Sequence, residues 1–347
     1  MTPRERQLAA IRHEVPDRIP ADCICIELVE QLYSRFGARS YPEVLLKLEL
    51  DGWTIAAGYV GPSPKADDGT QLTEWGFEPD WVFLQERRRP LAGATSTAQI
   101  ERYPWPSADR YDYAAAAALA REWGDRLCLR GPYWVPLFTR VCGLVGMEET
   151  MINTLAEPAL FEAALEHVYQ WTAEYCTRLL EACGDAMPVL SVADDFATQR
   201  GMMISPALWR KYVKPRQARI FEIGKKAGKV IWFHSCGNIL EVLPDLIDMG
   251  MDVWETVQLH TLPISPRELK GLYGRHVTFF GGVNTQRLPF LTPQEVRGET
   301  LRCLEALGEG GGYICGPDHH VKPDVPMENC LALFDTIKGF RREGYTA

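Results

Sequence analysis

The hydrophobic positions from about residue 125 onward form short apolar runs separated by amphipathic stretches. Each run is rich in β-branched and aromatic residues and carries apolar side chains on both alternating faces. Strands that are buried on both faces and separated by helices form parallel sheets. The six runs are "RLCLRGPYW", "MPVLSVADD", "KVIWFHSC", "DVWETVQ", "HVTFFGGV" and "GGYICGPD".

Helices are predicted between these runs. The longest follows Pro158, where apolar residues from Phe161 to Tyr175 recur at helical spacing. Other helix starts, each with a capping residue followed by proline, lie at residues 2–3, 205–206, 265–266 and 292–293. These strand and helix units, with "RIPADCICIEL" as the first strand, predict an α/β fold: a (β/α)₈ TIM-type barrel with an N-terminal helix.

Residues 50–125 depart from this pattern. The stretches "GPSPKADDGTQLTEWGFEP" and "YPWPSADRYDY" are rich in Pro, Gly, Asp and aromatic residues, which is typical of loops or a hairpin. We therefore expect one barrel domain over residues 1–347, with 50–125 as an insertion or cap over the barrel mouth. An open doubly wound sheet is the alternative, but no strand is followed by a glycine-rich nucleotide-binding motif.

Composition and charge narrow the possible partners. The chain is 46% hydrophobic with a net charge of -9, and no run of Lys or Arg is long enough to neutralise a phosphate backbone. We expect neither nucleic acid nor a membrane as a partner, and no segment reaches the ~20 apolar residues of a membrane span. The protein is expected to be cytoplasmic. Its 10 cysteines are then thiols or metal ligands rather than disulfides.

Polar residues follow several predicted strands, at the end of a barrel where chemistry takes place. His234 and Cys236 are two residues apart, so their side chains point to the same side of an extended strand. Cys315 ends the last strand, which neighbours the first in a closed barrel. Two thiolates and an imidazole suit Zn²⁺ and leave one coordination position open, as in catalytic zinc sites. The other polar residues at strand ends are Asp194, Asp195, Asn284, Asp318, His319 and His320.

Structural interpretations of the same residues stay open. Free cysteine often acts as a small buried hydrophobe, and this is our interpretation of the cysteines other than Cys236 and Cys315. Asp194 and Asp195 either orient a substrate or cap a helix. His319 and His320 are either solvated loop residues or part of the site.

The sequence resembles the uroporphyrinogen decarboxylase superfamily and, within it, the zinc-dependent, corrinoid-linked methyltransferases. The resemblance runs over nearly the whole chain and is densest in "VIWFHSCGNILEVLPDLIDMGMDVWETVQ" and "GGYICGPDHHVKPDVPMEN". In the methylcobalamin:coenzyme M methyltransferases of this family a His-x-Cys pair and a distant Cys hold zinc. The resemblance thus implies His234, Cys236 and Cys315 as ligands. The fourth position is open to Glu255, Asp195 or water.

The resemblance implies transfer of a methyl group between a small thiol or methyl ether and a corrinoid. A thiolate bound to zinc keeps much of its nucleophilicity, and zinc can also act as a Lewis acid on an ether oxygen. Asp194, Asp195, Asn284 and His320 are candidate catalytic or substrate-binding residues. The chain lacks the D-x-H-x-x-G run common in corrinoid-binding modules, so we expect the cobalamin to be supplied by a partner protein.

Two alternatives belong to other functional classes. The first is decarboxylation of a tetrapyrrole, but the decarboxylases carry an N-terminal R-Q-A-G-R stretch that is missing after "DRIPADCICIEL". A substrate with many carboxylates would also require a strongly basic cleft, whereas the arginines here are scattered. The second alternative is a noncatalytic ligand-binding barrel, against which an open soft-metal site argues.

Overall fold

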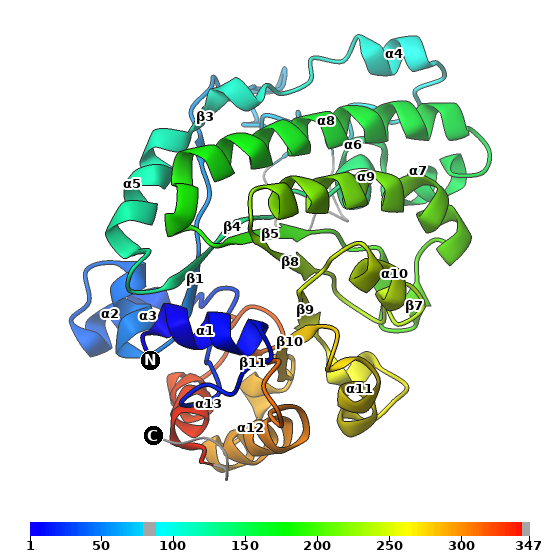
Figure 1. The fold of residues 1–347 in the computed structure, drawn as a ribbon. Helices are drawn as coiled ribbons and strands as arrows, with labels where there is room; N and C mark the ends of the chain where they lie inside the picture. The colour runs from blue at the N-terminus through cyan, green and yellow to red at the C-terminus, as the bar shows by residue number, and fades with distance from the viewer. Residues whose placement is uncertain (79–87, 342–347) are drawn as a thin grey trace.

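Seven strands form one curled parallel sheet in the order β1-β4-β5-β8-β9-β10-β11 (Figure 1). The computed structural model describes residues 1–78 and 88–341. The strands are β1 (Gly52–Thr54), β4 (Cys128–Tyr133), β5 (Val189–Ala193), β8 (Val230–His234), β9 (Val253–Val257), β10 (Thr278–Val283) and β11 (Tyr313–Pro317). The six strands from β4 to β11 coincide with the six apolar runs, which confirms the predicted TIM-type fold.

An irregular segment, and not the predicted regular strand, completes the ring between β11 and β1. The main-chain N–H of Cys315 donates to Pro20 and that of Asp22 donates to Cys315, at 2.9 and 3.1 Å. On the other side the N–H of Asp51 donates to Ala21 at 2.8 Å. Pairing occurs only as isolated bridges, at Ala21 and Ile26, because the chain bends between them. "RIPADCICIEL" is therefore in the expected place but does not form a continuous strand.

The barrel interior is a separate apolar cluster closed at one end by α1 (Pro3–Ile11). Alternate residues of the strands point inward, and Ala10 and Ile11 of α1 pack against them. The N–H of Gly312, just before β11, donates to Ala10 at 3.0 Å, so α1 lies where the strands begin. The opposite end, where the strands finish, is the barrel mouth. The inward residues are Cys128, Val189, Trp232, Val253, Phe280 and Ile314.

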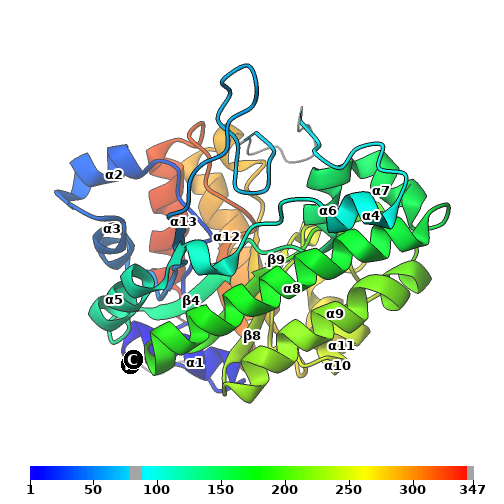
Figure 2. The ribbon, with the colours of Figure 1, turned by 90° about the horizontal axis from the view of Figure 1, so that it is seen from above.

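Helices surround the sheet and bury a larger core against its outer face. The long helices α8 (Pro158–Cys183) and α9 (Pro206–Lys226) lie side by side (Figure 2). The five predicted starts, at residues 3, 158, 206, 266 and 293, are confirmed. The other helices are α2 (Val29–Phe36), α3 (Tyr41–Lys47), α4 (Thr97–Glu101), α5 (Tyr113–Trp123), α6 (Phe138–Val145), α7 (Met147–Asn153), α10 (Leu243–Asp248), α11 (Pro266–Tyr273), α12 (Pro293–Leu307) and α13 (Met327–Gly339). The 3₁₀ turns are η2 (Ala108–Arg110), η3 (Gly184–Ala186), η4 (Leu259–Thr261) and η5 (Leu288–Phe290).

The segment 50–125 contributes to the barrel at both of its ends. Near its start, β1 pairs in parallel with β4, and near its end α5 packs against α8 and leads into β4. Between them β2 (Gly58–Tyr59) pairs antiparallel with β3 (Tyr111–Asp112), and the ring of Trp75 packs 4.9 Å from that of Trp171 on α8. The part that is additional to the barrel is therefore narrower than we predicted, and residues 79–87 of it lie outside the described residues. A further short hairpin pairs β6 (Ala197–Thr198) with β7 (Gly201–Met202).

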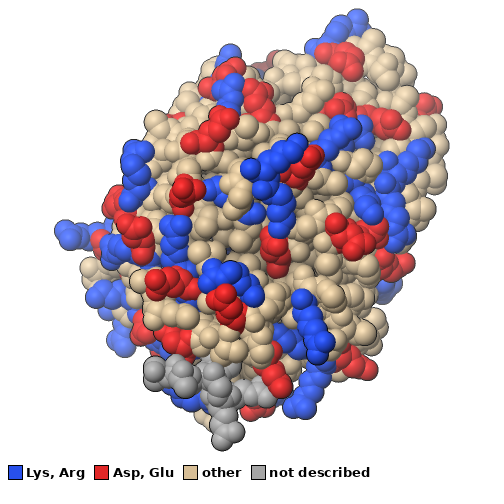
Figure 3. Space-filling view, viewed as in Figure 1, with Lys and Arg blue, Asp and Glu red and all other residues tan. Residues whose placement is uncertain are grey.

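Charged side chains of both signs are interspersed on the face shown in Figure 3, without an extended patch of one sign. Among residues 1–78 and 88–341, no helix combines the length and the apolar character needed to cross a membrane.

Candidate metal centre

Three side chains meet at the barrel mouth with metal-ligating atoms directed at one another. These atoms of His234, Cys236 and His319 all lie within 4.8 Å of one another. His234 ends β8, Cys236 follows two residues later, and His319 lies in the loop after β11. Nε2 of His234 is 3.5 Å from Sγ of Cys236, and ligand atoms around a tetrahedral zinc ion are roughly 3.3–3.8 Å apart. The predicted His234–Cys236 pair therefore has a geometry that fits zinc.

Glu255 lies behind His234 and not at the position of a fourth ligand. The two residues are paired on neighbouring strands β8 and β9. Nδ1 of His234 lies 2.9 Å from Oε1 of Glu255, whose other oxygen accepts a hydrogen bond from the indole N–H of Trp232. A carboxylate on one ring nitrogen orients the other nitrogen toward a metal. Glu255 thus positions the imidazole, whereas the sequence suggested it as a possible direct ligand.

Cys315 does not belong to this group in the described part of the chain. Its neighbour Ile314 points into the barrel interior, and because side chains alternate along a strand, Cys315 points outward. There it lies in the outer core with Tyr313 and with Cys303 of α12. Burial, together with Cys303, raises the pKa of the Cys315 thiol. The structure thus offers His319, and not Cys315, beside the His-x-Cys pair.

The two aspartates after β5 differ in what they contact. The Asp194 carboxylate is fully buried and accepts hydrogen bonds from the main-chain N–H groups of Phe138 and Thr139, at 2.8 and 2.9 Å. It therefore caps the start of α6, which is the structural alternative left open by the sequence, and burial raises its pKa to about 6. Asp195 is the aspartate at the centre: its Oδ1 accepts from the N–H of Cys236 at 2.8 Å and lies 3.7 Å from Nε2 of His234.

Asn284 and His320 have other contacts. Oδ1 of Asn284 accepts from the N–H of Gln286 at 2.9 Å and shapes the loop after β10. Nδ1 of His320 lies 3.1 Å from the carboxylate of Glu27. Neither residue is part of the three-residue group.

The structure adds two residues that the sequence analysis missed. The hydroxyl of Tyr133 lies 3.4 Å from Nδ1 of His234, and the two rings are 5.4 Å apart. The side chain of Gln258 accepts from the N–H of Gly237 at 2.8 Å and approaches Sγ of Cys236 at 3.9 Å. Tyr133 ends β4, and Gln258 directly follows β9. Their signal was available, since both lie at or next to the end of an apolar run, as do the residues we selected.

The electrostatic environment sets the protonation of the group without a metal. Burial and the charge of His234 lower the pKa of His319 to about 2, so its imidazole is neutral, as a ligand must be. Burial and Asp195 raise the pKa of the Cys236 thiol. Burial opposes a charge on His234, but Cys236 and Glu255 outweigh it and raise the His234 pKa. A divalent cation would displace these protons and replace them with its own charge.

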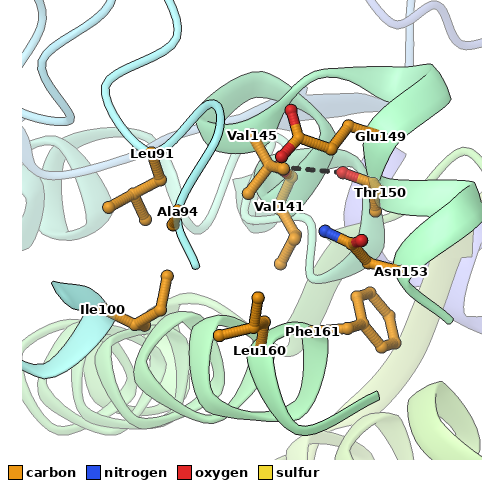
Figure 4. Close-up of a pocket in the computed structure, with 10 residues that line it drawn as sticks. All are labelled: Leu91, Ala94, Ile100, Val141, Val145, Glu149, Thr150, Asn153, Leu160 and Phe161. Carbon is orange, nitrogen blue, oxygen red and sulfur yellow. Dashed lines mark hydrogen bonds between the residues drawn. The ribbon is translucent and has the colours of Figure 1, made fainter. Parts of the chain in front are cut away.

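A cavity among the outer helices is too small for a substrate. It lies between α4, α6, α7 and α8 and is lined mainly by apolar side chains (Figure 4). Its volume of about 10 Å³ is that of roughly one water position. The candidate metal centre is therefore a better place for chemistry than this cavity.

Comparison with known proteins identifies the family of this chain. Residues 89–340 match the family model described as uroporphyrinogen decarboxylase (URO-D). The matched range is more than half of the chain, and the protein belongs to this family.

Curated relatives and a solved structure extend the comparison. A uroporphyrinogen decarboxylase of Thermus thermophilus is 30% identical over 52% of this chain and 49% of its own length, so the match spans about half of that relative. One of Methylococcus capsulatus is 26% identical over 73% of this chain and 71% of its own. A methyltransferase from Methanosarcina mazei superimposes with a TM-score of 0.71 at 21% identity, over 97% of this chain and 98% of its own. This last likeness shows the shared fold.

Proposed function

We propose that the protein is a zinc-dependent methyltransferase that moves a methyl group between a small substrate and a corrinoid carried by a partner protein. The observation that carries the proposal is the convergence of His234, Cys236 and His319 at the barrel mouth. Family membership and the methyltransferase with the same fold support it. One thiolate and two imidazoles are ligands that zinc accepts, with a fourth position left for substrate.

The ligand set favours a methyl ether over a thiol as the substrate. A single thiolate leaves zinc with a net positive charge, whereas two thiolates would cancel it. Bound by these residues, zinc would supply Lewis acidity toward a substrate oxygen. We therefore place a small methyl ether in the fourth position, as a methyl donor to the partner's corrinoid.

The surrounding residues have separate tasks in this proposal. Glu255 keeps Nε2 of His234 directed at the centre, and Asp195 fixes the main chain of Cys236 through a 2.8 Å hydrogen bond. Tyr133 packs its ring against His234 and shields it from water on one side. Its hydroxyl lies 3.4 Å from Nδ1 of His234, the nitrogen that Glu255 also contacts, so Tyr133 helps to hold the imidazole in place.

Decarboxylation of a tetrapyrrole is the second candidate, and the names of the curated relatives favour it. The buried charges of the barrel argue against it. Arg130 is 1% exposed, and its Nη1 is bound to Asp22 at 2.6 Å. This guanidinium is already paired and does not offer its charge to a substrate with many carboxylates.

The metal content of the purified protein tests the proposal, and variants of the candidate ligands and of Cys315 show which residues hold the metal. We expect about one zinc per chain in the purified wild type and its loss in Cys236→Ser and His319→Ala. Cys315→Ser is the matched control, because that thiol points away from the centre, and it should retain zinc. Mass spectrometry of the purified proteins gives the answer. A folded wild type that stays metal-free after zinc is offered would remove the proposal, and loss of zinc in Cys315→Ser would restore Cys315 as a ligand.

A corrinoid assay separates the two candidate functions. The zinc-loaded protein, a reduced cob(I)alamin and a phenyl methyl ether should give the absorption spectrum of methylcobalamin, with no activity in Cys236→Ser. Turnover of uroporphyrinogen that persists after zinc is removed would instead support the decarboxylase.

A further inference from the structure

A second cavity, of about 290 Å³, lies on the outer side of the barrel wall where β10 ends. It is bounded by η4, the start of α11 and the inner side of α12. Its volume is near the lower limit of the ~300–1,000 Å³ of small-molecule sites. Much of its wall is apolar or weakly polar, with Leu259, Val283 and Cys303 among the lining residues. It has room for a compact organic molecule.

The polar wall of this cavity has more cationic than anionic groups. Arg287 and Arg302 both direct a guanidinium nitrogen toward Oε1 of Glu299; Arg287 makes the closer ion pair, and Arg302 is 3.7 Å away. The Glu299 side chain is 9% exposed, whereas those of the arginines are 56% and 68% exposed. Each guanidinium has five N–H donors, and most of them are left for a ligand.

Other acidic groups near the arginines are committed to their own contacts. Glu295 is exposed at the start of α12. Its carboxylate accepts a hydrogen bond from the main-chain N–H of Thr292 at 2.7 Å. Asp318 is 1% exposed, and its Oδ1 accepts from the N–H of Thr285 at 2.9 Å, while Oδ2 lies 3.4 Å from Nδ1 of His260. His260 itself lines the cavity. Among the lining residues, two guanidiniums thus face a single carboxylate.

We propose that this cavity binds a small organic carboxylate with a compact apolar body, at a site separate from the candidate metal centre. The carboxylate of the ligand accepts hydrogen bonds from the N–H groups of Arg287 and Arg302 that Glu299 does not use. The apolar body contacts Leu259, Val283 and Cys303. The apolar wall favours this class over an inorganic anion, which would leave that surface without a partner.

Calorimetric titration of the full-length protein with benzoate tests the proposal. We expect saturable binding to the wild type, weakened at least about tenfold in the double variant Arg287→Gln/Arg302→Gln, because charge-assisted hydrogen bonds are lost. Arg297→Gln is the matched control: it removes the same charge from an exposed position of α12 outside the cavity lining. This control should bind benzoate as the wild type does.

Two further probes define the ligand class. Benzamide, which has the same body without the charge, and inorganic phosphate, which has charge without the body, should each bind at least about tenfold more weakly than benzoate. Equal affinity for phosphate, no saturable benzoate binding, or an equal loss in Arg297→Gln would each overturn the proposal.

Titrations of zinc-stripped protein and of Cys236→Ser distinguish benzoate binding at this cavity from binding at the candidate metal centre. Both should bind benzoate with unchanged affinity, because the cavity uses none of the three candidate ligands. Binding that disappears with the metal would place benzoate at the barrel mouth and remove the second site, whatever the outcome for the methyltransferase.

Discussion

At the scale of single residues, alternation along a strand decides which side chains reach the candidate centre. His-x-Cys was predictable because i and i+2 point to the same side. Cys315 was chosen for its residue type and its strand-end position. Its neighbour Ile314 faces the barrel interior, so the side chain of Cys315 points to the outside of the barrel. The register of β10 against β11 sets Phe280, also an interior residue, beside Ile314. Strand register depends on tertiary structure and cannot be deduced from the sequence of one strand. The sequence therefore indicated the correct strand end but did not decide whether His319 belongs to the site.

The residue behind His234 gives a prediction at the same scale. Glu255 accepts hydrogen bonds at both of its oxygens, from His234 and from Trp232, whereas a glutamine has one acceptor oxygen. In Glu255→Gln one of the two donors loses its acceptor, and we expect zinc affinity to fall about 10–100-fold. Competition with a chromophoric chelator measures this affinity.

Glu30→Gln, an exposed change on α2, is the control for this experiment. It should leave the zinc affinity at the wild-type value. An unchanged affinity in Glu255→Gln would mean that the contact does not orient the imidazole.

At the scale of elements, helices with local caps were predictable and those with distant caps were not. The helices starting at residues 266 and 293 carry their own capping boxes, Ser265 with Glu268 and Thr292 with Glu295. The start of α6 has no side-chain cap from its own N-cap residue, Leu137. Its N–H groups are satisfied by Asp194, which is 56 residues away from Phe138 in the sequence. No local pattern reports such a contact, and α6 was absent from our predicted elements.

The distant cap gives a stability prediction for α6. Asp194→Ala leaves two main-chain N–H groups without their buried acceptor, and we expect a loss of about 1–3 kcal/mol in the free energy of unfolding. Urea denaturation of the metal-free proteins measures it. Asp125→Ala, at an exposed position, is the control and should unfold at the wild-type urea concentration. Equal stability of the two variants would show that Asp194 is not a structural cap.

At the scale of the whole molecule, buried charges support the irregular segment whose main-chain hydrogen bonds close the barrel. Asp51 is fully buried and binds Arg6 of α1 at 2.6 Å and Arg18 at 2.8 Å. Its Oδ2 also accepts from the N–H of Ala21, the residue that bridges to β11, at 2.8 Å. The apolar run of "RIPADCICIEL" identified the place of the closing segment, but these ionic contacts determine its path.

Asp17 extends this network and gives it a dependence on pH. Burial opposes its charge, but the hydrogen bond from Arg6 at 2.5 Å outweighs this and holds the Asp17 pKa below its ordinary value. Because the folded-state pKa is lower than the unfolded value of about 3.9, Asp17 stabilises the fold above that pH, and the contribution is lost as the pH falls.

Asp17→Asn should therefore lower the free energy of unfolding by about 1 kcal/mol near neutral pH. The difference from wild type should vanish as the pH is taken well below 4, whereas Asp335→Asn, which removes an exposed partner of Lys338, should show no such trend. Denaturation curves across this range measure the difference, and a constant difference would mean that Asp17 acts through packing and not through its charge.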